Sequence, residues 1–206
     1  FRTYTNVTLL EFCDLNHPLL KRLMMEAPGS YHHSMLVAHM SEVAADAIGA
    51  NGLMCRVGAY FHDIGKVLKP GFFVENLRSE SNPHDALVPT MSAIIIISHV
   101  KEGMDLAIQY RLNSRIIDFI REHHGTTLVN FFFHRAQELA KDQAGNTTST
   151  VDPSSFRYPG PIPQTKETAI VALADTLEAA SRTLKKPTIA RIEALINRIV
   201  EERYRE

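Results

Sequence analysis

The chain has 206 residues, 45% of them hydrophobic and 22% charged, which is typical of a globular protein with a sizeable core. Its formal net charge of −1 excludes a global basic field for DNA or RNA duplexes, so a phosphate-bearing ligand must be held by a local feature. No apolar run approaches the roughly 18 residues of a membrane-spanning helix, and the start at Phe1 suggests a domain cut from a longer protein or a processed chain.

Helical periodicity dominates the first half of the chain. The segment 7–13 is short and ambiguous, and 71–89 is predicted to be a loop because prolines interrupt it. Longer helices are predicted from Asn16-His17-Pro18 to just before Pro28, over Tyr31–Ile48 and over Leu53–Leu68. Cys13 and Cys55 have apolar neighbours and are interpreted as buried free thiols of a reducing compartment, although a disulfide is compatible with the sequence.

The second half continues in helices, with one exceptional segment. Thr90–Lys101 contains a run of isoleucines that fits a helix or a buried strand, and its helical neighbours favour a helix. A short turn or helix follows at Leu106–Tyr110, and further helices are predicted at Arg115–His124, Phe131–Lys141, Thr168–Leu184 and 188–204. Residues 143–165 are polar and proline-rich, and a loop of that length is either functional or disordered. We therefore predict one all-α domain over 1–206, with its core at 28–184.

Residues that can bind metals recur at the ends or on the inner faces of these helices. They are His33, His62, Asp63, His99, His123, His124 and Asp175. A single histidine on an apolar face is more often a hydrogen-bonded core residue, but His62-Asp63 lies in an apolar segment, where an unpaired carboxylate is costly. Metal coordination would make that burial tolerable. The whole set exceeds what one ion needs and suits two octahedral metals, with Asp63 between them.

Lys66 is the candidate cation of the site. It follows Asp63 by three residues and His62 by four, so it is predicted to share their helical face. From there its ammonium would reach a phosphate oxygen, and Gly65 would leave room for the close approach. The other interpretation is a solvated lysine at a helix end. We predict Asp63 and Lys66 as catalytic residues, while Lys66 and His84 are the candidates for the general acid.

These residues carry a resemblance to a known family. The pattern His33 … His62-Asp63 … Asp175 resembles the HD-domain superfamily of metal-dependent phosphohydrolases. The longer string that adds Lys66, His99 and His123-His124-Gly125-Thr126-Thr127 is similar to the cytosolic domain of the seven-transmembrane HD receptors, which are cyclic di-AMP phosphodiesterases. Supporting stretches are 72–76, Asn82-Pro83-His84-Asp85 and Arg157-Tyr158-Pro159-Gly160-Pro161. The resemblance covers residues 28–184.

The resemblance implies an HD-domain helical bundle around a dinuclear metal site, and hydrolysis of cyclic di-AMP to linear pApA by two-metal water activation. The nitrogen-rich ligand set without thiolates suits iron or manganese, and zinc is not excluded. Substrate contacts are predicted at Lys66, Thr126, Thr127, Arg157, Tyr158 and Arg182. The alternatives are that the proline-rich loop is a mobile insertion and that Arg182 faces solvent.

Other functions fit parts of the pattern. A cyclic di-GMP phosphodiesterase would carry a His-His-Glu and Gly-Tyr-Pro signature, whereas Gly125-Thr126-Thr127 follows the histidine pair in this chain. An HD nucleotidase with one metal would leave His99 and the pair His123-His124 without a metal role. A noncatalytic HD sensor module predicts lost ligands, and all of them are present. The run Phe131–Phe133 is interpreted as core packing rather than as a surface for a binding partner.

The resemblance also implies a cellular setting. It predicts the cytoplasmic domain of a bacterial inner membrane protein, attached to the membrane only through a tethering segment absent from this chain. The expected ligand is cyclic di-AMP, without a DNA or RNA duplex, and a homo-oligomer is compatible with the sequence.

Overall fold

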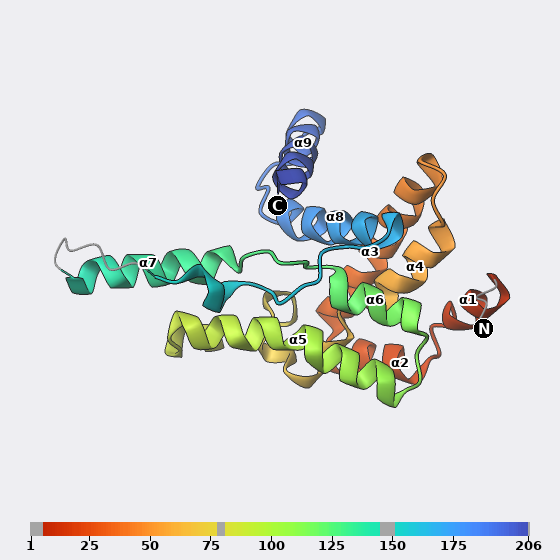
Figure 1. Ribbon diagram of the computed structural model, residues 1–206, viewed down its shortest axis with the longest axis horizontal. Coiled ribbons are helices and arrows are strands. Elements are labelled where there is room, and N and C mark those ends of the chain that lie inside the picture. The colour runs from red at the N-terminus through yellow and green to blue at the C-terminus, as the bar shows by residue number, and fades with distance from the viewer. Residues whose placement is uncertain (1–5, 78–80, 145–150, 206) are drawn as a thin grey trace.

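In the computed structural model, residues 6–77, 81–144 and 151–205 are described, and the named elements within these ranges are all helical (Figure 1). The α-helices are α1 Asn6–Phe12, α2 Pro18–Glu26, α3 Pro28–Ala47, α4 Gly52–Phe61, α5 Pro89–Gln109, α6 Ser114–Glu122, α7 Asn130–Ala144, α8 Lys166–Ser181 and α9 Ile189–Arg205. The predicted all-α fold class is therefore confirmed.

Local signals account for where several helices begin. Proline occupies the first turn of α2, α3 and α5, where its missing N–H group costs nothing. The Asn113 side chain accepts a hydrogen bond from the Arg115 backbone at 2.8 Å and caps α6. Thr165 and Thr168 form a reciprocal capping box at the start of α8. These caps fix the ends of helices that carry candidate ligands.

Two apolar clusters hold the central helices together. In one, Leu23 of α2 packs with Phe61 of α4 and Ile120 of α6, and all three are buried. In the other, α3, α4 and α8 meet through small and branched side chains such as Ala38, Ala59 and Val171. Figure 1 shows α7 and the N-terminal part of α5 extending side by side away from this bundle, and a third cluster joins them.

The predicted helix Leu53–Leu68 is wrong in its second half. α4 ends at Phe61, and a separate 3₁₀ helix, η1, spans Ile64–Leu68. Asp63, between them, has φ −103° and ψ 14°, which departs from the α-helical conformation. The change of helix type lets the adjacent His62 and Asp63 side chains turn toward one centre, whereas on a continuous α-helix they would point about 100° apart.

Two other predicted segments differ in detail. Thr90–Lys101 and Leu106–Gln109 belong to one helix, α5, which continues through Gly103 because no proline follows Pro89 before the helix ends at Gln109. The predicted loop 71–89 contains the short 3₁₀ helices η2 Pro70–Phe72, η3 Val74–Asn76 and η4 Pro83–Ala86.

The proline-rich segment 143–165 is described except for residues 145–150, which lie outside the described ranges. It contains the 3₁₀ helix η5, Pro153–Phe156, and an isolated bridge joins Leu128 to Arg157. Cys13 and Cys55 are free thiols, and Cys13 is only partly buried. Among the described helices, none combines the length and the apolar character needed to cross a membrane.

Candidate metal centre

The structure brings all the predicted ligands together from separate helices. His33 lies on α3, His99 on α5 and Asp175 on α8. The pair His62-Asp63 lies between α4 and η1, and His123-His124 directly follows α6. Their potential ligand atoms form two groups, each within 4.8 Å: Asp63, His99, His123 and His124, and His33, His62, Asp63 and Asp175. Asp63 belongs to both groups.

Unpartnered buried atoms at the centre show that these residues fit metal ions. Nε2 of His62 and both carboxylate oxygens of Asp63 are buried and have no hydrogen-bond partner among the described residues. The Lys66 ammonium lies 2.7 Å from Oδ2 of Asp63 as an ion pair, but without hydrogen-bond geometry. Such atoms cost free energy unless something satisfies them. A pair of cations bound by these nitrogens and oxygens would do so.

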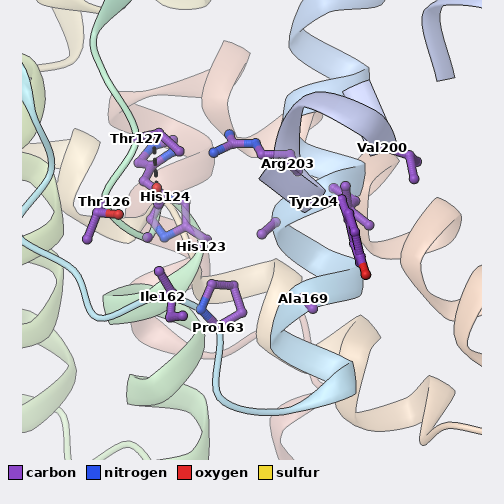
Figure 2. A pocket seen from close by; sticks show the side chains of 13 residues that line it. His123, His124, Thr126, Thr127, Ile162, Pro163, Ala169, Val200, Arg203 and Tyr204 are labelled. Carbon is purple, nitrogen blue, oxygen red and sulfur yellow. Dashed lines mark hydrogen bonds between the residues drawn. The ribbon is translucent and has the colours of Figure 1, made fainter. Parts of the chain in front are cut away.

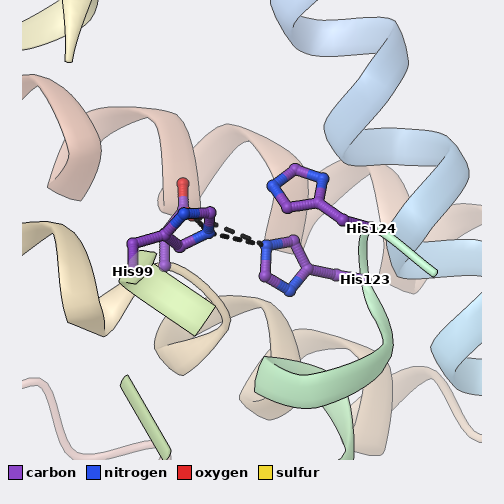
Figure 3. A group of neighbouring side chains, drawn as sticks. His99, His123 and His124 are labelled. Atoms are coloured by element: carbon purple, nitrogen blue, oxygen red, sulfur yellow. Dashed lines mark hydrogen bonds and ion pairs between the residues drawn. The ribbon is translucent and has the colours of Figure 1, made fainter. Parts of the chain in front are cut away.

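Hydrogen bonds to the outer ring nitrogens orient the histidines. Nδ1 of His62 donates to the Ala59 carbonyl at 2.7 Å, and Nδ1 of His99 donates to the Ile96 carbonyl at 2.6 Å. His123 makes the same kind of bond at 2.9 Å, with the carbonyl three residues before it. In each ring, Nε2 thereby faces the centre, where it offers a lone pair to a metal ion once the ring is neutral. Figure 3 shows the rings of His99, His123 and His124 lying together, and Nε2 of His99 lies 3.3 Å from Nε2 of His123.

The electrostatics of the cluster favour positive charge at its centre. Burial opposes ionisation of Asp63, but Lys66 and His62 hold its pKa well below the usual range. Burial also opposes protonation of His62, yet Asp63 and Asp175 raise the pKa of His62 to about 10. Burial, assisted by the charge on His62, lowers the pKa of His123 to about 3, so this ring is neutral. Ionised carboxylates and a neutral imidazole are the forms that bind metal ions.

Lys66 is held between two carboxylates. Its Nζ lies 2.7 Å from Oδ2 of Asp63 and 2.8 Å from Oε1 of Glu75. Glu75 in turn accepts a hydrogen bond of 2.9 Å from the Ser30 hydroxyl. The spacing of three residues places Lys66 beside Asp63, as the sequence predicts. The expectation for Gly65 is wrong, because Gly65 faces α5: a Cβ added there would lie 1.9 Å from the His99 carbonyl oxygen.

Beside the cluster lies a cavity of about 910 Å³, which we call the metal cavity. His33, His99, His124 and Asp175 contribute to its wall, so a ligand in the cavity can reach both groups of ligands. A second cavity of about 320 Å³ adjoins it between α8, α9 and residues 123–127 (Figure 2). Both cavities are lined by His124, Thr127 and Arg203.

Four of the predicted substrate contacts line the metal cavity: Lys66, Thr127, Tyr158 and Arg182. The Tyr158 ring stacks on the His124 ring with 4.1 Å between centroids. Arg182 forms an ion pair with Glu178 at 2.8 Å, and Thr126 lines the second cavity. Arg157 is exposed and lines neither of these two cavities; its guanidinium donates to the Thr126 carbonyl at 3.0 Å. Direct contact between any of these residues and a substrate stays a prediction.

Some residues of the site escaped sequence reasoning. Glu178, Glu75 and Arg203 all line the metal cavity. Glu178 lies three residues after Asp175 on α8, so its position on the same helical face was a usable signal. His84, a candidate general acid, is buried and donates from Nε2 to the Phe72 carbonyl at 2.9 Å, and it is not among the residues that line the metal cavity.

Comparisons with known proteins agree with this geometry. The family model described as "HD domain" matches residues 30–180. The chain is 44% identical over 206 residues to the cyclic-di-AMP phosphodiesterase PgpH of Bacillus subtilis, covering 100% of the chain and 28% of that protein. It is 46% identical over 204 residues to PgpH of Listeria monocytogenes, covering 99% of the chain and 27% of that protein. The chain thus spans little more than a quarter of the length of these relatives.

A solved structure is similar in fold as well as in sequence. The HD domain of L. monocytogenes PgpH, crystallised in complex with cyclic di-AMP, superimposes with a TM-score of 0.84 at 46% identity. The match covers 92% of this chain and 85% of that one.

Proposed function

The chain belongs to the HD domain family, and on this premise we propose that it forms one HD domain that hydrolyses cyclic di-AMP to linear pApA. The observation that carries the proposal is the pair of ligand groups that share Asp63. The substrate is supported by the similarity to relatives named cyclic-di-AMP phosphodiesterases and to a domain crystallised with cyclic di-AMP.

The proposed cofactor is a pair of divalent cations, iron or manganese, held by His33, His62, Asp63, His99, His123, His124 and Asp175. Nitrogen and carboxylate ligands without a thiolate support this choice. Two such cations, when bound, would supply a nucleophilic water at neutral pH and neutralise charge on the phosphodiester.

The side chains around the cluster have roles that follow from their contacts. Glu178 holds the His33 ring through Nδ1, so that Nε2 faces Asp63 and Asp175. Lys66, fixed between Asp63 and Glu75, provides a positive charge beside the position proposed for the reacting phosphate. Tyr158 covers one face of His124 and restricts access of bulk water to that ligand.

The proposed reaction consumes one water molecule. Its oxygen forms a bond to phosphorus, and the bond between that phosphorus and a ribose 3′ oxygen breaks. One proton of the water ends on the departing 3′ oxygen, and the new phosphate monoester remains on the 5′ oxygen. Opening one of the two phosphodiesters therefore yields linear pApA.

We further propose that the domain belongs to a longer bacterial membrane protein and lies on its cytoplasmic side. The support is that the relatives are much longer than this chain, which covers 28% and 27% of them. The described helices themselves supply no membrane-spanning segment.

The test is a turnover assay on protein loaded with manganese or iron. Cyclic di-AMP, cyclic di-GMP and a panel of nucleoside triphosphates are incubated separately, and the products are resolved by chromatography. The proposal requires pApA from cyclic di-AMP at a rate well above that for the other substrates. Turnover of triphosphates alone would indicate a nucleotidase, preference for cyclic di-GMP would correct the substrate, and no turnover would favour a noncatalytic module.

A further inference from the structure

The phenylalanine run Phe131–Phe133 splits between the core and the surface. Phe132 is buried, and Phe133 packs against Phe156 with 5.6 Å between ring centroids. Phe131, in contrast, is 69% exposed. The prediction of core packing is therefore wrong for Phe131, whose ring needs another explanation. An exposed aromatic ring beside a cavity is a feature of ligand-binding surfaces.

Phe131 lies at the mouth of a cavity of about 380 Å³ that we call the aromatic cavity. Its lining is rich in rings: Phe72, Phe73, His84, Phe131 and Phe132. It also includes Val74, whose side chain is 75% exposed on η3. The volume is sufficient for a flat heterocycle the size of a purine, and the rings offer faces on which such a base can stack.

The aromatic cavity adjoins the metal cavity. Both are lined by Phe73, Val74, Glu75, Ile96 and Phe131. Phe73 links the two directly: its ring centroid lies 5.7 Å from that of His99, and Lys66 Nζ lies 5.1 Å from the Phe73 centroid. A phosphodiester held near Lys66 would therefore have its attached nucleoside beside Phe73 and close to Phe131.

We propose that the aromatic cavity binds one purine base of the cyclic dinucleotide, with Phe131 stacking on its face. This inference rests on the proposed function, because the phosphodiester at the metal centre determines where the base can reach. It assigns a substrate-binding role to Phe73 and Phe131.

The second cavity, between α8 and α9, is the alternative location for a base. Its wall is mostly aliphatic, with side chains such as Ile162, Pro163 and Leu173. Tyr204, at its edge, is 92% exposed. The rings in this wall are His123 and His124, which belong to the candidate metal centre, and the exposed Tyr204, so the aromatic cavity, with its several phenylalanine rings, is the better match for a purine.

The absence of tryptophan from the chain allows a direct test by fluorescence. Phe131→Trp introduces a single tryptophan at the proposed stacking position, and Tyr204→Trp introduces one at the alternative cavity. Each variant, loaded with manganese, is titrated with the bis-phosphorothioate analogue of cyclic di-AMP, which resists hydrolysis. Saturable quenching in Phe131→Trp but not in Tyr204→Trp is expected. Quenching in both variants would support the inference and place the second base in the second cavity. Quenching in Tyr204→Trp alone or in neither variant would overturn the inference.

Kinetics provide a second, independent measurement. Phe131→Ala removes a side chain that is mostly exposed, so folding should be unaffected. We expect its KM for cyclic di-AMP to rise about tenfold, the effect of losing one base stack. Ile94→Ala, on the exposed face of α5, is the matched control and should leave this KM unchanged.

The two proposals fail in different ways. If the wild-type protein produces no pApA, the proposed function is wrong and this inference falls with it. If the wild-type protein turns over cyclic di-AMP while Phe131→Ala keeps the wild-type KM, the function stands and the base site is rejected.

Discussion

Nδ1 of His33 lies 2.5 Å from Oε2 of Glu178, and both side chains are buried between α3 and α8. The other ring nitrogen, Nε2, lies 2.9 Å from Oδ1 of Asp175. Together the two contacts fix the orientation of the imidazole. Burial alone would lower the pKa of His33, but the carboxylates of Asp175 and Glu178 raise it. Glu178 thus acts through His33 as a positioning residue.

Glu178→Gln should therefore weaken metal binding. The amide keeps the shape of the side chain and an acceptor for Nδ1, but it loses the negative charge that increases the basicity of the ring. We expect the apparent metal affinity to fall about 10- to 100-fold, as measured by competition with a chromophoric chelator. Activity should recover at high metal concentration. Glu193→Gln on the exposed side of α9 is the control, and equal affinities in the two variants would contradict the role of Glu178.

Metal loading should stabilise the fold, since Asp63 and Asp175 are buried close together in the ionised state. A ligand present at a hundredfold excess over its Kd adds about 2.7 kcal/mol when it binds only the native state. We expect manganese to raise the melting temperature and a chelator to reverse the increase. Asp63→Asn should abolish both the increase and the activity while keeping the helical circular dichroism. A persistent increase in Asp63→Asn would remove Asp63 from the centre.

Gly65→Ala should disrupt the contact between η1 and α5. The added methyl group would lie 1.9 Å from the His99 carbonyl oxygen and 2.6 Å from the Gly103 nitrogen, so the backbones must separate. We expect a loss of at least about 3 kcal/mol in the free energy of unfolding, at the upper end for overpacking, and weaker metal binding because His99 shifts.

Gly71→Ala is the matched control for this variant, because an added Cβ there has no neighbour within 4 Å among the described residues. Its free energy of unfolding should change by less than about 0.5 kcal/mol. Urea denaturation of both variants measures the difference. Similar stability of Gly65→Ala and the wild type would show that the η1–α5 contact is not close-packed in solution.

Arg203 is predicted to contribute to substrate binding from α9. Figure 2 shows its side chain pointing toward Thr127 and His124, and its Nη2 donates to the Thr176 hydroxyl at 2.7 Å. Arg203→Gln should raise KM for cyclic di-AMP about 10- to 100-fold, the range for losing a hydrogen bond to a charged group. Thr176→Val removes the hydrogen bond that ties Arg203 to α8 but keeps the guanidinium. If Thr176→Val causes the same rise in KM, the role of Arg203 is structural.

His17 should make stability depend on pH. Its Nδ1 accepts a hydrogen bond from the Leu19 backbone at 3.2 Å, and burial lowers its pKa although Asp14 opposes the effect. The folded pKa of His17 is below the unfolded value of about 6.5. The contribution of the neutral His17 ring to the free energy of unfolding is therefore complete above about pH 6.5 and declines as the pH falls below it. His17→Asn keeps a capping acceptor without a titrating ring. The stability difference between wild type and His17→Asn should therefore change between about pH 7.5 and about pH 5; a constant difference would contradict the prediction.

The helices and the clustering of the candidate ligands were predictable because both depend on local signals. Apolar spacing indicated the helices, and the adjacent pairs His62-Asp63 and His123-His124 indicated ligands without any knowledge of the fold. The end of the α-helix at Phe61 was not predictable from periodicity, because residues 64 and 68 continue the apolar spacing of α4. Just after it, Gly65 packs closely against the backbone of α5, a tertiary contact that local periodicity does not encode.

The surroundings of the ligands were harder to predict than the ligands. Arg203 reaches the site only because α9 folds back on α8, and no pattern near residue 203 indicates this. Arg157 was predicted from the resemblance to lie beside the substrate; it is exposed next to Thr126, and its contact with a substrate stays a prediction. The role of a side chain that acts through long-range contacts is difficult to predict from the local sequence.

The shared ligand Asp63 joins elements that are far apart along the chain, from His33 on α3 to Asp175 on α8. Bound ions would therefore act as crosslinks that close long loops, as disulfides do in other small domains. In this protein both cysteines are free thiols. Limited metal supply would consequently reduce both turnover and resistance to proteolysis, so that the lifetime of the domain would follow its metal content.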